Sequence, residues 1–167
     1  MIYSVHADGR LIFSGRELRC ALGRSGVVAG AIKREGDGAT PAGVWPLRRL
    51  FWRADRRPAP VCRLETRVIA PDDGWCDSPA DPAYNTLVRL PYAASAERLW
   101  RDDTLYDLVV ALGYNDDPVS PGAGSAIFLH LARPGYEATE GCVALANEDL
   151  QVFLRAVRPG DAIRVLA

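Results

Sequence analysis

The 167-residue sequence is short of lysine, and it lacks both a surplus of charge and any long hydrophobic run. Lys33 is the single lysine, and 20 basic against 21 acidic side chains leave a formal charge of -1. Because phosphate binding needs a basic face, this balance excludes nucleic acid as the main partner. No apolar run approaches the roughly 18 residues of a membrane span, so we expect no membrane partner.

The first residues also lack the features of an export signal. MIYSVHADGRLIF has no basic segment followed by an apolar one, so it does not resemble a secretory signal peptide. We therefore expect the protein to be cytoplasmic, and periplasmic only if a leader has been removed. In the cytoplasm the four cysteines are expected to be thiols.

Metal-ligating side chains are scarce as well. The sequence has four cysteines, none of them in a CxxC pair, and two histidines. These spacings do not match those of structural zinc sites, so we predict neither a metal ion nor another cofactor.

Short alternating segments separated by turns dominate the sequence and are typical of β-strands. With 49% hydrophobic residues, the chain is long enough to bury a core and corresponds to a single domain, 1–167. The predicted strands cover 1–6, 10–14, 17–22, 86–90, 106–113, 125–131 and 161–167, with further apolar runs at 26–32 and 44–54. Together they predict a mainly β fold, a sandwich or open barrel of mixed sheets.

One helix is predicted near the C-terminus, over 147–158. Asn147 is a suitable N-cap, and the apolar residues that follow it recur on one helical face. A weaker helical pattern covers 95–101. The turn-rich stretch 71–84 is predicted to be a long loop, and loops of that length are often functional.

Cys142 is the predicted nucleophile. It lies in the segment Thr139-Glu140-Gly141-Cys142-Val143, where a sulfur can be exposed and backbone N–H groups can converge on an oxyanion. His130 lies twelve residues earlier, near the end of a predicted strand, so a returning loop can bring the imidazole to the sulfur. Such a pair forms a thiolate at neutral pH and an imidazolium that protonates the leaving amine.

The other cysteines and the other histidine are weaker candidates. Cys20 and Cys62 alternate with apolar neighbours and are predicted to be core residues. Cys76 is the rival nucleophile, but it has no histidine nearby in sequence and is expected to be a loop residue. His6 has no cysteine beside a glycine near it. Buried cysteines are more often inert packing groups than nucleophiles, so spacing alone leaves both interpretations of Cys142 open.

The segment IFLHLARPGYEATEGCVAL resembles the signature of the YkuD-type L,D-transpeptidase catalytic domain, in which a histidine and a loop precede Ser/Thr-x-Gly-Cys-(Val/Ile). GDGATPAGVWPL resembles the Thr-Pro-x-Gly segment of that family. GWCDSPADPAYN, and YDLVVALGYN followed by GSAIFLH, are similar to its short, leaderless branch. The four motifs occur in order over residues 24–167, and by them the chain is identified as a member of the family.

The resemblance implies a β-rich fold and a cysteine acyl-transferase that acts on peptidoglycan stem peptides. Such enzymes attack the carbonyl of the third stem residue, commonly meso-diaminopimelate, and release the terminal D-alanine. By the same resemblance Cys142 is the nucleophile and His130 its base, while the carbonyl of Leu131 orients the imidazole. The N–H groups of Gly141 and Cys142 would hold the oxyanion, and Thr139 either braces the loop or takes part in catalysis.

The sequence departs from the family pattern at three places. Glu140 stands where the family usually has a second histidine, and Ala144 stands where an arginine or asparagine is usual. The loop between His130 and Thr139 is shorter than in secreted members. The contacts of the two replaced side chains therefore cannot be transferred, and Glu140 is either an exposed loop acid or a contact for a substrate ammonium group.

Further substrate contacts are predicted from composition. Loops that mix aromatic rings with amides are typical of peptide or sugar grooves, although each such residue is more often structural. Arg133, three residues after His130, is a candidate for contact with a carboxylate of the stem peptide. The loop candidates are Trp75, Tyr84, Asn85, Tyr114 and Asn115.

Two fates of the acyl-enzyme are open. Water gives an L,D-carboxypeptidase that trims a tetrapeptide to a tripeptide, and an amine gives an L,D-transpeptidase that forms 3,3 cross-links or exchanges D-amino acids. Without an export signal the protein would meet only soluble muropeptides, so a carboxypeptidase of peptidoglycan recycling is favoured. A non-catalytic muropeptide-binding sensor is a third hypothesis, which the presence of both Cys142 and His130 disfavours.

Carbapenem-type inhibitors are expected to react with the thiol, and the sequence does not indicate an oligomeric state.

Overall fold

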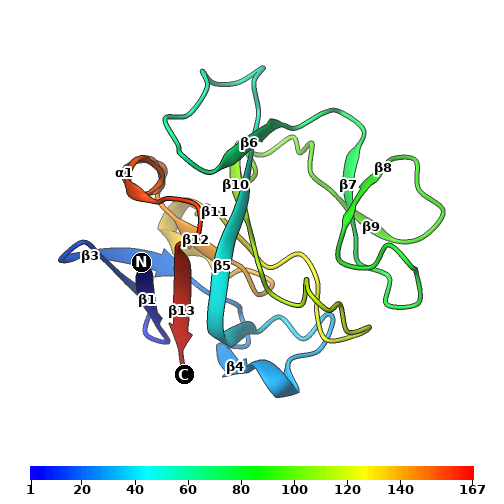
Figure 1. The fold of residues 1–167 in the computed structure, drawn as a ribbon, viewed down its shortest axis with the longest axis horizontal. Helices are drawn as coiled ribbons and strands as arrows, with labels where there is room; N and C mark the ends of the chain where they lie inside the picture. Colours follow the sequence, from blue (N-terminus) through cyan, green and yellow to red (C-terminus); the bar gives the residue numbers. More distant parts are fainter.

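Eight β-strands that pair in a closed ring make up most of the molecule. The computed structural model describes residues 1–167. In ring order the strands are β10 (Leu108–Leu112), β11 (Phe128–Leu131), β12 (Val143–Leu145), β3 (Arg16–Ala21), β2 (Arg10–Phe13), β1 (Ile2–His6), β13 (Ala162–Leu166) and β5 (Thr40–Trp52). The pairing of β5 with β10 closes the ring into a barrel (Figure 1). The predicted mainly β fold with mixed sheets is confirmed.

Strand β5 is the longest strand and connects the parts of the sheet. Its 13 residues pair with β13 and β10, its two neighbours in the ring. It also pairs in parallel with two short strands, β4 (Val27–Ala29) and β6 (Glu65–Val68). Two neighbouring pairs within the ring are parallel as well, β1 with β13 and β11 with β12, which makes the sheet mixed.

Side chains alternate between the inside and the outside of the barrel. In β10, Leu108 and Val110 belong to the main core cluster, whereas Val109 and Ala111 belong to a second cluster of eight residues. This is the two-residue period of a strand, with both faces covered. The main core of 24 residues lies inside the barrel and under the helix, and the second cluster lies on the outer face of β10 and β11.

A smaller sheet of three strands covers that outer face (Figure 1). It consists of β7 (Asp73–Cys76) between β8 (Leu87–Arg89) and β9 (Ala96–Arg98). Two predictions are therefore wrong: 71–84 is not a continuous loop, and 95–101 is not a helix. Pairing with β7 satisfies the backbone of both segments and overrides their weak local preferences. Cys76 is fully buried in β7 rather than lying in a loop.

The C-terminal helix α1 (Asn147–Ala156) packs on the barrel core through Leu150, Phe153 and Leu154. It begins as predicted but ends two residues before 158, because the chain turns extended at its C-cap, ahead of Pro159 and Gly160. Asn147 is the first helical residue rather than the N-cap. Its side-chain oxygen accepts a hydrogen bond from Arg57 at 3.1 Å instead of capping the helix. The two remaining short elements are the 3-10 turns η1 (Gly30–Ile32) and η2 (Pro134–Tyr136).

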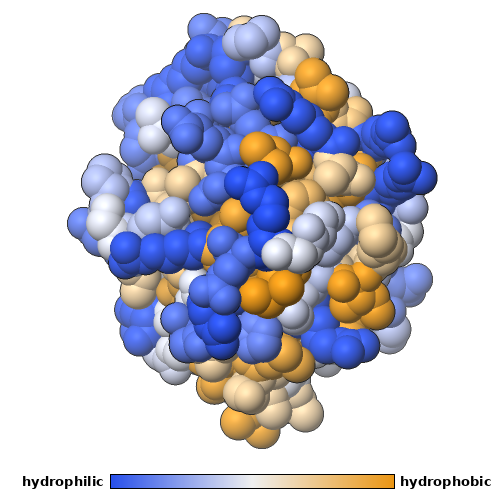
Figure 2. All heavy atoms as spheres, turned by 90° about the vertical axis from the view of Figure 1, so that its left-hand side faces the viewer, coloured by the Kyte–Doolittle hydropathy of each residue, from blue (hydrophilic) through white to orange (hydrophobic).

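The outer surface mixes polar and apolar side chains. On the face seen in Figure 2, apolar residues form separate patches among hydrophilic ones rather than one continuous area. The helices offer no apolar stretch of the length that a bilayer crossing requires.

Candidate functional site

The parallel pairing of β11 and β12 brings the predicted catalytic residues together. His130 lies in β11 opposite Ala144, and Cys142 immediately precedes β12. Because Leu129 and Leu131 face the barrel core, Phe128 and His130 point to the opposite, outer face. His130 and Cys142 both line a cavity of about 740 Å³ on that face.

The imidazole of His130 has a defined tautomer. Its Nδ1 lies 2.8 Å from the carbonyl oxygen of Leu131, and since a carbonyl only accepts, Nδ1 carries the hydrogen. The basic nitrogen is then Nε2. The ring of Tyr106 packs edge-on against the imidazole, with centroids 5.3 Å apart. Burial lowers the pKa of His130 to about 4, so the imidazole is neutral at pH 7.

The thiol of Cys142 is buried, which differs from the exposed sulfur that we predicted. The side chain is 7% exposed. Its Sγ accepts a hydrogen bond from the N–H of Phe128 at 3.3 Å and donates one to the carbonyl of Ala126 at 3.2 Å. Burial, and then the carboxylate of Glu97, raise the pKa of Cys142 to about 12. The two groups that line the cavity are therefore a neutral thiol and a neutral imidazole at pH 7, and not a thiolate and an imidazolium.

The loop before Cys142 also differs from the prediction in one hydrogen bond. The N–H of Gly141 donates to Oγ1 of Thr139 at 3.1 Å, and this hydroxyl donates to the carbonyl of Cys142 at 2.7 Å. The Gly141 N–H is thus not free to hold an oxyanion, whereas the N–H of Cys142 has no protein acceptor. Thr139 braces the loop in this structure.

Position 141 requires a glycine, because of its backbone conformation and because a side chain there would collide with a neighbouring segment. Its φ of +131° lies in a region that side chains rarely adopt, and an added Cβ would lie 2.8 Å from the carbonyl oxygen of Ala39. The GDGATP segment therefore supports the nucleophile loop directly.

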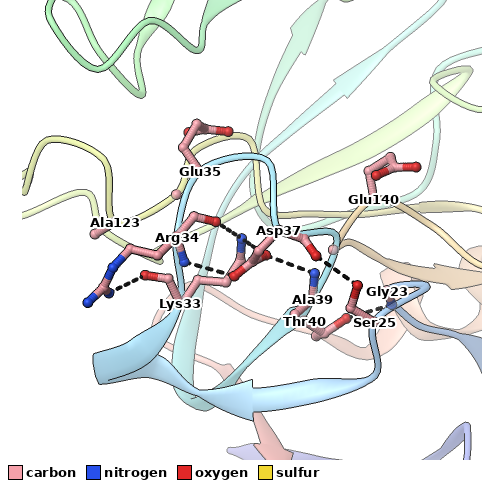
Figure 3. Close-up of polar contacts among 12 residues, drawn as sticks. Gly23, Ser25, Lys33, Arg34, Glu35, Asp37, Ala39, Thr40, Ala123 and Glu140 are labelled. Carbon is pink, nitrogen blue, oxygen red and sulfur yellow. Dashed lines mark hydrogen bonds and ion pairs between the residues drawn. The ribbon is translucent and has the colours of Figure 1, made fainter.

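The same segment is held by the carboxylate of Asp37, as Figure 3 shows. Asp37 accepts hydrogen bonds from the ammonium of Lys33 at 2.6 Å and from the N–H groups of Arg34 and Ala39. Burial raises the pKa of Asp37, but these hydrogen bonds outweigh it and leave the pKa below its ordinary value. Lys33 is 3% exposed, so the single lysine is a structural part of the cavity wall.

Glu140 lies at the rim of the cavity and is largely exposed. Arg24 donates from Nε to both of its carboxylate oxygens, at 2.8 and 3.0 Å. Its side chain is 76% exposed, as expected for a loop acid. The ion pair connects the nucleophile loop to the segment that follows β3. The backbone N–H of Arg24 makes a second connection, because it donates to the backbone carbonyl of Thr139.

The aromatic and amide residues predicted as substrate contacts lie outside the cavity and make hydrogen bonds within the protein. Asn85 donates to the carbonyls of Tyr114 and Asn115 and accepts from the indole N–H of Trp75. It also accepts from the N–H of Ala126, whose carbonyl binds the Cys142 thiol. These side chains shape the wall behind the nucleophile. Trp75, Tyr84, Asn85, Tyr114 and Asn115 are absent from the lining of this cavity, and their contact with a substrate stays a prediction.

Arg133 does line the cavity, together with Thr139 and Glu140. The guanidinium of Arg133 is held loosely, since its nearest carboxylates, on Asp103 and Glu137, are both 3.9 Å away. Several lining residues were not predicted: Lys33, Glu35, Asp77, Glu97, Arg101, Tyr106 and Ser125. Asp77 follows β7 in a segment that was predicted to be a loop, and Glu97 lies in β9, where a helix was predicted. The sequence therefore did not indicate that either residue lines the cavity.

The fold and the cavity define a β-barrel protein that presents one thiol and one neutral imidazole in a single cavity. Over residues 1–165 the sequence matches the family described as YkuD: L,D-transpeptidase catalytic domain. The chain therefore belongs to the YkuD family, as its motifs indicated. The match begins at residue 1, so the first three strands are part of the family domain as well.

Solved structures that resemble the chain include an L,D-transpeptidase from Mycobacterium smegmatis, with 13% identity and a TM-score of 0.47. The alignment covers 99% of this chain and 58% of that one. L,D-transpeptidase 3 from Mycobacterium tuberculosis, in complex with a faropenem-derived adduct, has 14% identity, a TM-score of 0.48, and coverage of 99% and 60%. The chain thus spans less than two thirds of either protein. No curated protein matches the sequence.

Proposed function

We propose that the protein is a cysteine acyl-transferase that cleaves peptidoglycan stem tetrapeptides between the third residue, meso-diaminopimelate, and D-alanine. The observation that carries this proposal is that Cys142 and His130 line one cavity, with the tautomer of His130 leaving Nε2 free to accept a proton. In the favoured form of the proposal the acceptor is water, and the protein is an L,D-carboxypeptidase of soluble muropeptides in the cytoplasm.

The proposed reaction starts from the neutral pair. Nε2 of His130 takes the proton of the Cys142 thiol as the sulfur attacks the carbonyl carbon of the third residue. The N–H of Cys142 is the available donor for the oxyanion. The C–N bond then breaks, and the imidazolium gives its proton to the departing amine of D-alanine. His130 then takes a proton from water as the water oxygen attacks the thioester carbonyl. The C–S bond breaks, the imidazolium returns the proton to the sulfur, and the tripeptide acid leaves and ionises.

Arg133 is the proposed contact for the terminal carboxylate of the tetrapeptide. It lines the cavity with His130, and its 3.9 Å separations from Asp103 and Glu137 leave it free to turn toward a ligand. Arg101, by contrast, is fixed by two hydrogen bonds to Asp103, at 2.6 and 2.8 Å. A free carboxylate at the end of the substrate is what an enzyme that removes one terminal residue must recognise.

Transpeptidation is the second candidate function, because the same acyl-enzyme can react with an amine. Cys142 and His130 line a single cavity. Water is the favoured acceptor because it needs no binding surface beyond that cavity, whereas an amine acceptor needs room there for a second peptide. A muropeptide sensor would need the cavity but not the thiol.

The deciding experiment is mass spectrometry of the protein incubated with disaccharide-tetrapeptide, with and without excess D-amino acid. We expect loss of one D-alanine in buffer alone. Exchange or dimer formation without net hydrolysis would instead establish the transpeptidase, and binding without turnover would establish the sensor. Turnover of intact sacculi but not of soluble fragments would contradict the cytoplasmic role.

A β-lactam provides the matched test of the nucleophile. The faropenem-derived adduct belongs to the mycobacterial protein in whose structure it was found. For this chain we expect a penem or carbapenem to add its mass to the wild type and not to Cys142→Ala. Labelling that persists in the variant would reject Cys142 and point to another thiol.

A further inference from the structure

Three carboxylates on the cavity wall have no cationic partner in the protein. Glu35, Asp77 and Glu97 all line the cavity that contains Cys142, and none of them forms an ion pair, whereas most other acidic side chains of the chain do. Leaving negative charges together and unpaired in a partly enclosed site is unfavourable. In a chain with 20 basic side chains, this arrangement needs an explanation.

Two of the three cations that line the same cavity are paired with other carboxylates, and the third, Arg133, forms no ion pair with Glu35, Asp77 or Glu97. Lys33 binds Asp37 at 2.6 Å, and Arg101 binds Asp103 at 2.6 Å. Figure 3 shows Glu35 pointing away from the turn in which Lys33 and Asp37 interact. The field inside the cavity is therefore negative on the side of the three carboxylates.

Several polar atoms at this place lack partners. Ser125 is 7% exposed, lines the cavity, and its buried hydroxyl oxygen has no hydrogen-bond partner. Oδ1 of Asp77 is also buried without a partner. Glu35 and Glu97 each accept one hydrogen bond from a tyrosine hydroxyl at 2.5 Å, which leaves the second carboxylate oxygen of each without a protein donor. The two buried atoms, Oγ of Ser125 and Oδ1 of Asp77, are of a kind that is normally satisfied, so they indicate a missing partner.

We propose that Glu35, Asp77, Glu97 and Ser125 form a subsite for a primary ammonium group of the substrate, the free side-chain amine of the third stem residue. A primary ammonium has three N–H donors and a positive charge, which match several acceptors and an uncompensated negative field. The inference rests on the proposed function and adds a selection rule to it. Stem peptides whose side-chain amine is acylated, as in a cross-link, are rejected because they lack the charge and leave the carboxylates unpaired.

The subsite would also connect recognition with activation of the nucleophile. Burial, and after it the carboxylate of Glu97, raise the pKa of Cys142. Burial is also the main cause of the raised pKa of Glu97, to which Asp77 and Glu35 add and which Arg101 opposes. An ammonium group bound among these carboxylates opposes their field and favours the thiolate. A substrate with a free amine is then both bound more tightly and attacked more readily.

The test compares two tetrapeptides that differ only in whether the side-chain amine of the third residue is free or acetylated. We expect kcat/KM of the wild type to favour the free amine by about 10- to 100-fold, the usual effect of losing a charged hydrogen-bonded contact. In Asp77→Asn/Glu97→Gln the preference should fall to within about threefold. Glu17→Gln, on the exposed face of β3, is the matched control and should keep the wild-type preference.

Two further measurements separate the outcomes. Acylation by a penem that carries no amine should proceed in the double variant, which shows that the thiol site is intact. Binding of both peptides to Cys142→Ala tests the subsite without turnover. Preferential binding of the free amine without any hydrolysis by the wild type would support the subsite and overturn the proposed function. Equal treatment of both peptides by the wild type, or a preference unchanged in the double variant, would overturn the subsite.

Discussion

The inside of the barrel and the outer face of the same strands differ in what they bury. The interior cluster of 24 residues is almost entirely aliphatic and aromatic and includes the apolar face of α1. The outer cluster of eight residues includes Cys142 and Tyr106 and borders a cavity with eight charged side chains. Both clusters include residues of β10 and β11. Each of these strands therefore contributes one face to the barrel interior and the other face to the outer cluster at the site.

Strand β11 makes the difference explicit. Leu129 and Leu131 face the interior, while His130 between them faces the cavity. The rigid interior fixes the position of His130, and the pairing with β12 fixes Cys142 relative to it. A substitution on one face should therefore change stability, and a substitution on the other should change chemistry.

The largest expected effect is on the cavity side, in Cys142→Ala. Removing the nucleophile should lower kcat/KM by about 10⁴-fold or more. The thermal unfolding midpoint should fall less than in a barrel-core variant, because the loss is confined to one atom of the small outer cluster and its hydrogen bonds to Phe128 and Ala126. Peptide turnover and calorimetry on the same preparation check both parts. A variant that kept its activity, or that unfolded like a barrel-core variant, would remove the distinction between the two faces.

The next effect is expected on the interior side, in Leu129→Ala. This side chain is fully buried, and its truncation leaves a cavity in the barrel. We expect a loss of about 2–5 kcal/mol in the free energy of unfolding, measured by urea denaturation. Well below the unfolding transition, kcat/KM should stay within about threefold of the wild type. A loss of activity larger than the loss of stability would mean that the interior does more than hold the strand in place.

The smallest of the three effects concerns the pH dependence of stability. His130 has a pKa of about 4 in the folded protein, below the value of about 6.5 for a free imidazole. Between these pH values the unfolded chain binds a proton that the folded protein does not, so stability falls as the pH is lowered from 6.5 to 4. The contribution is about 3 kcal/mol. Urea denaturation across this range should show a shallower decrease for His130→Gln, and an unchanged decrease would contradict a buried neutral imidazole.

The features that the sequence predicted correctly depend on local patterns. Alternation located β1, β2, β3, β10 and β11, and the 3.6-residue period located α1. The order of four motifs pointed to the family, and the hydrogen bond between His130 and the carbonyl of Leu131 is present as expected.

The features that it missed depend on segments that are distant in sequence. Within the predicted helix 95–101, residues 96–98 form strand β9 because β7 lies beside them, so the local pattern was misleading. The burial of Cys142 and the occupied N–H of Gly141 follow from how the nucleophile loop packs. The convergence of Glu35, Asp77 and Glu97 needs three separate segments in place, and no spacing in the sequence indicates it.

The place of β13 in the ring has a consequence for the order in which the barrel can assemble. Residues 162–166 lie between β1 and β5 and pair with both. While the chain is being synthesised, β1 therefore has one edge without a partner until residues 162–166 have left the ribosome. An open edge of this kind can pair with another chain, and closure through such distant contacts is slow. We expect the nascent protein to depend on chaperones and to aggregate when its translation is interrupted before the last strand.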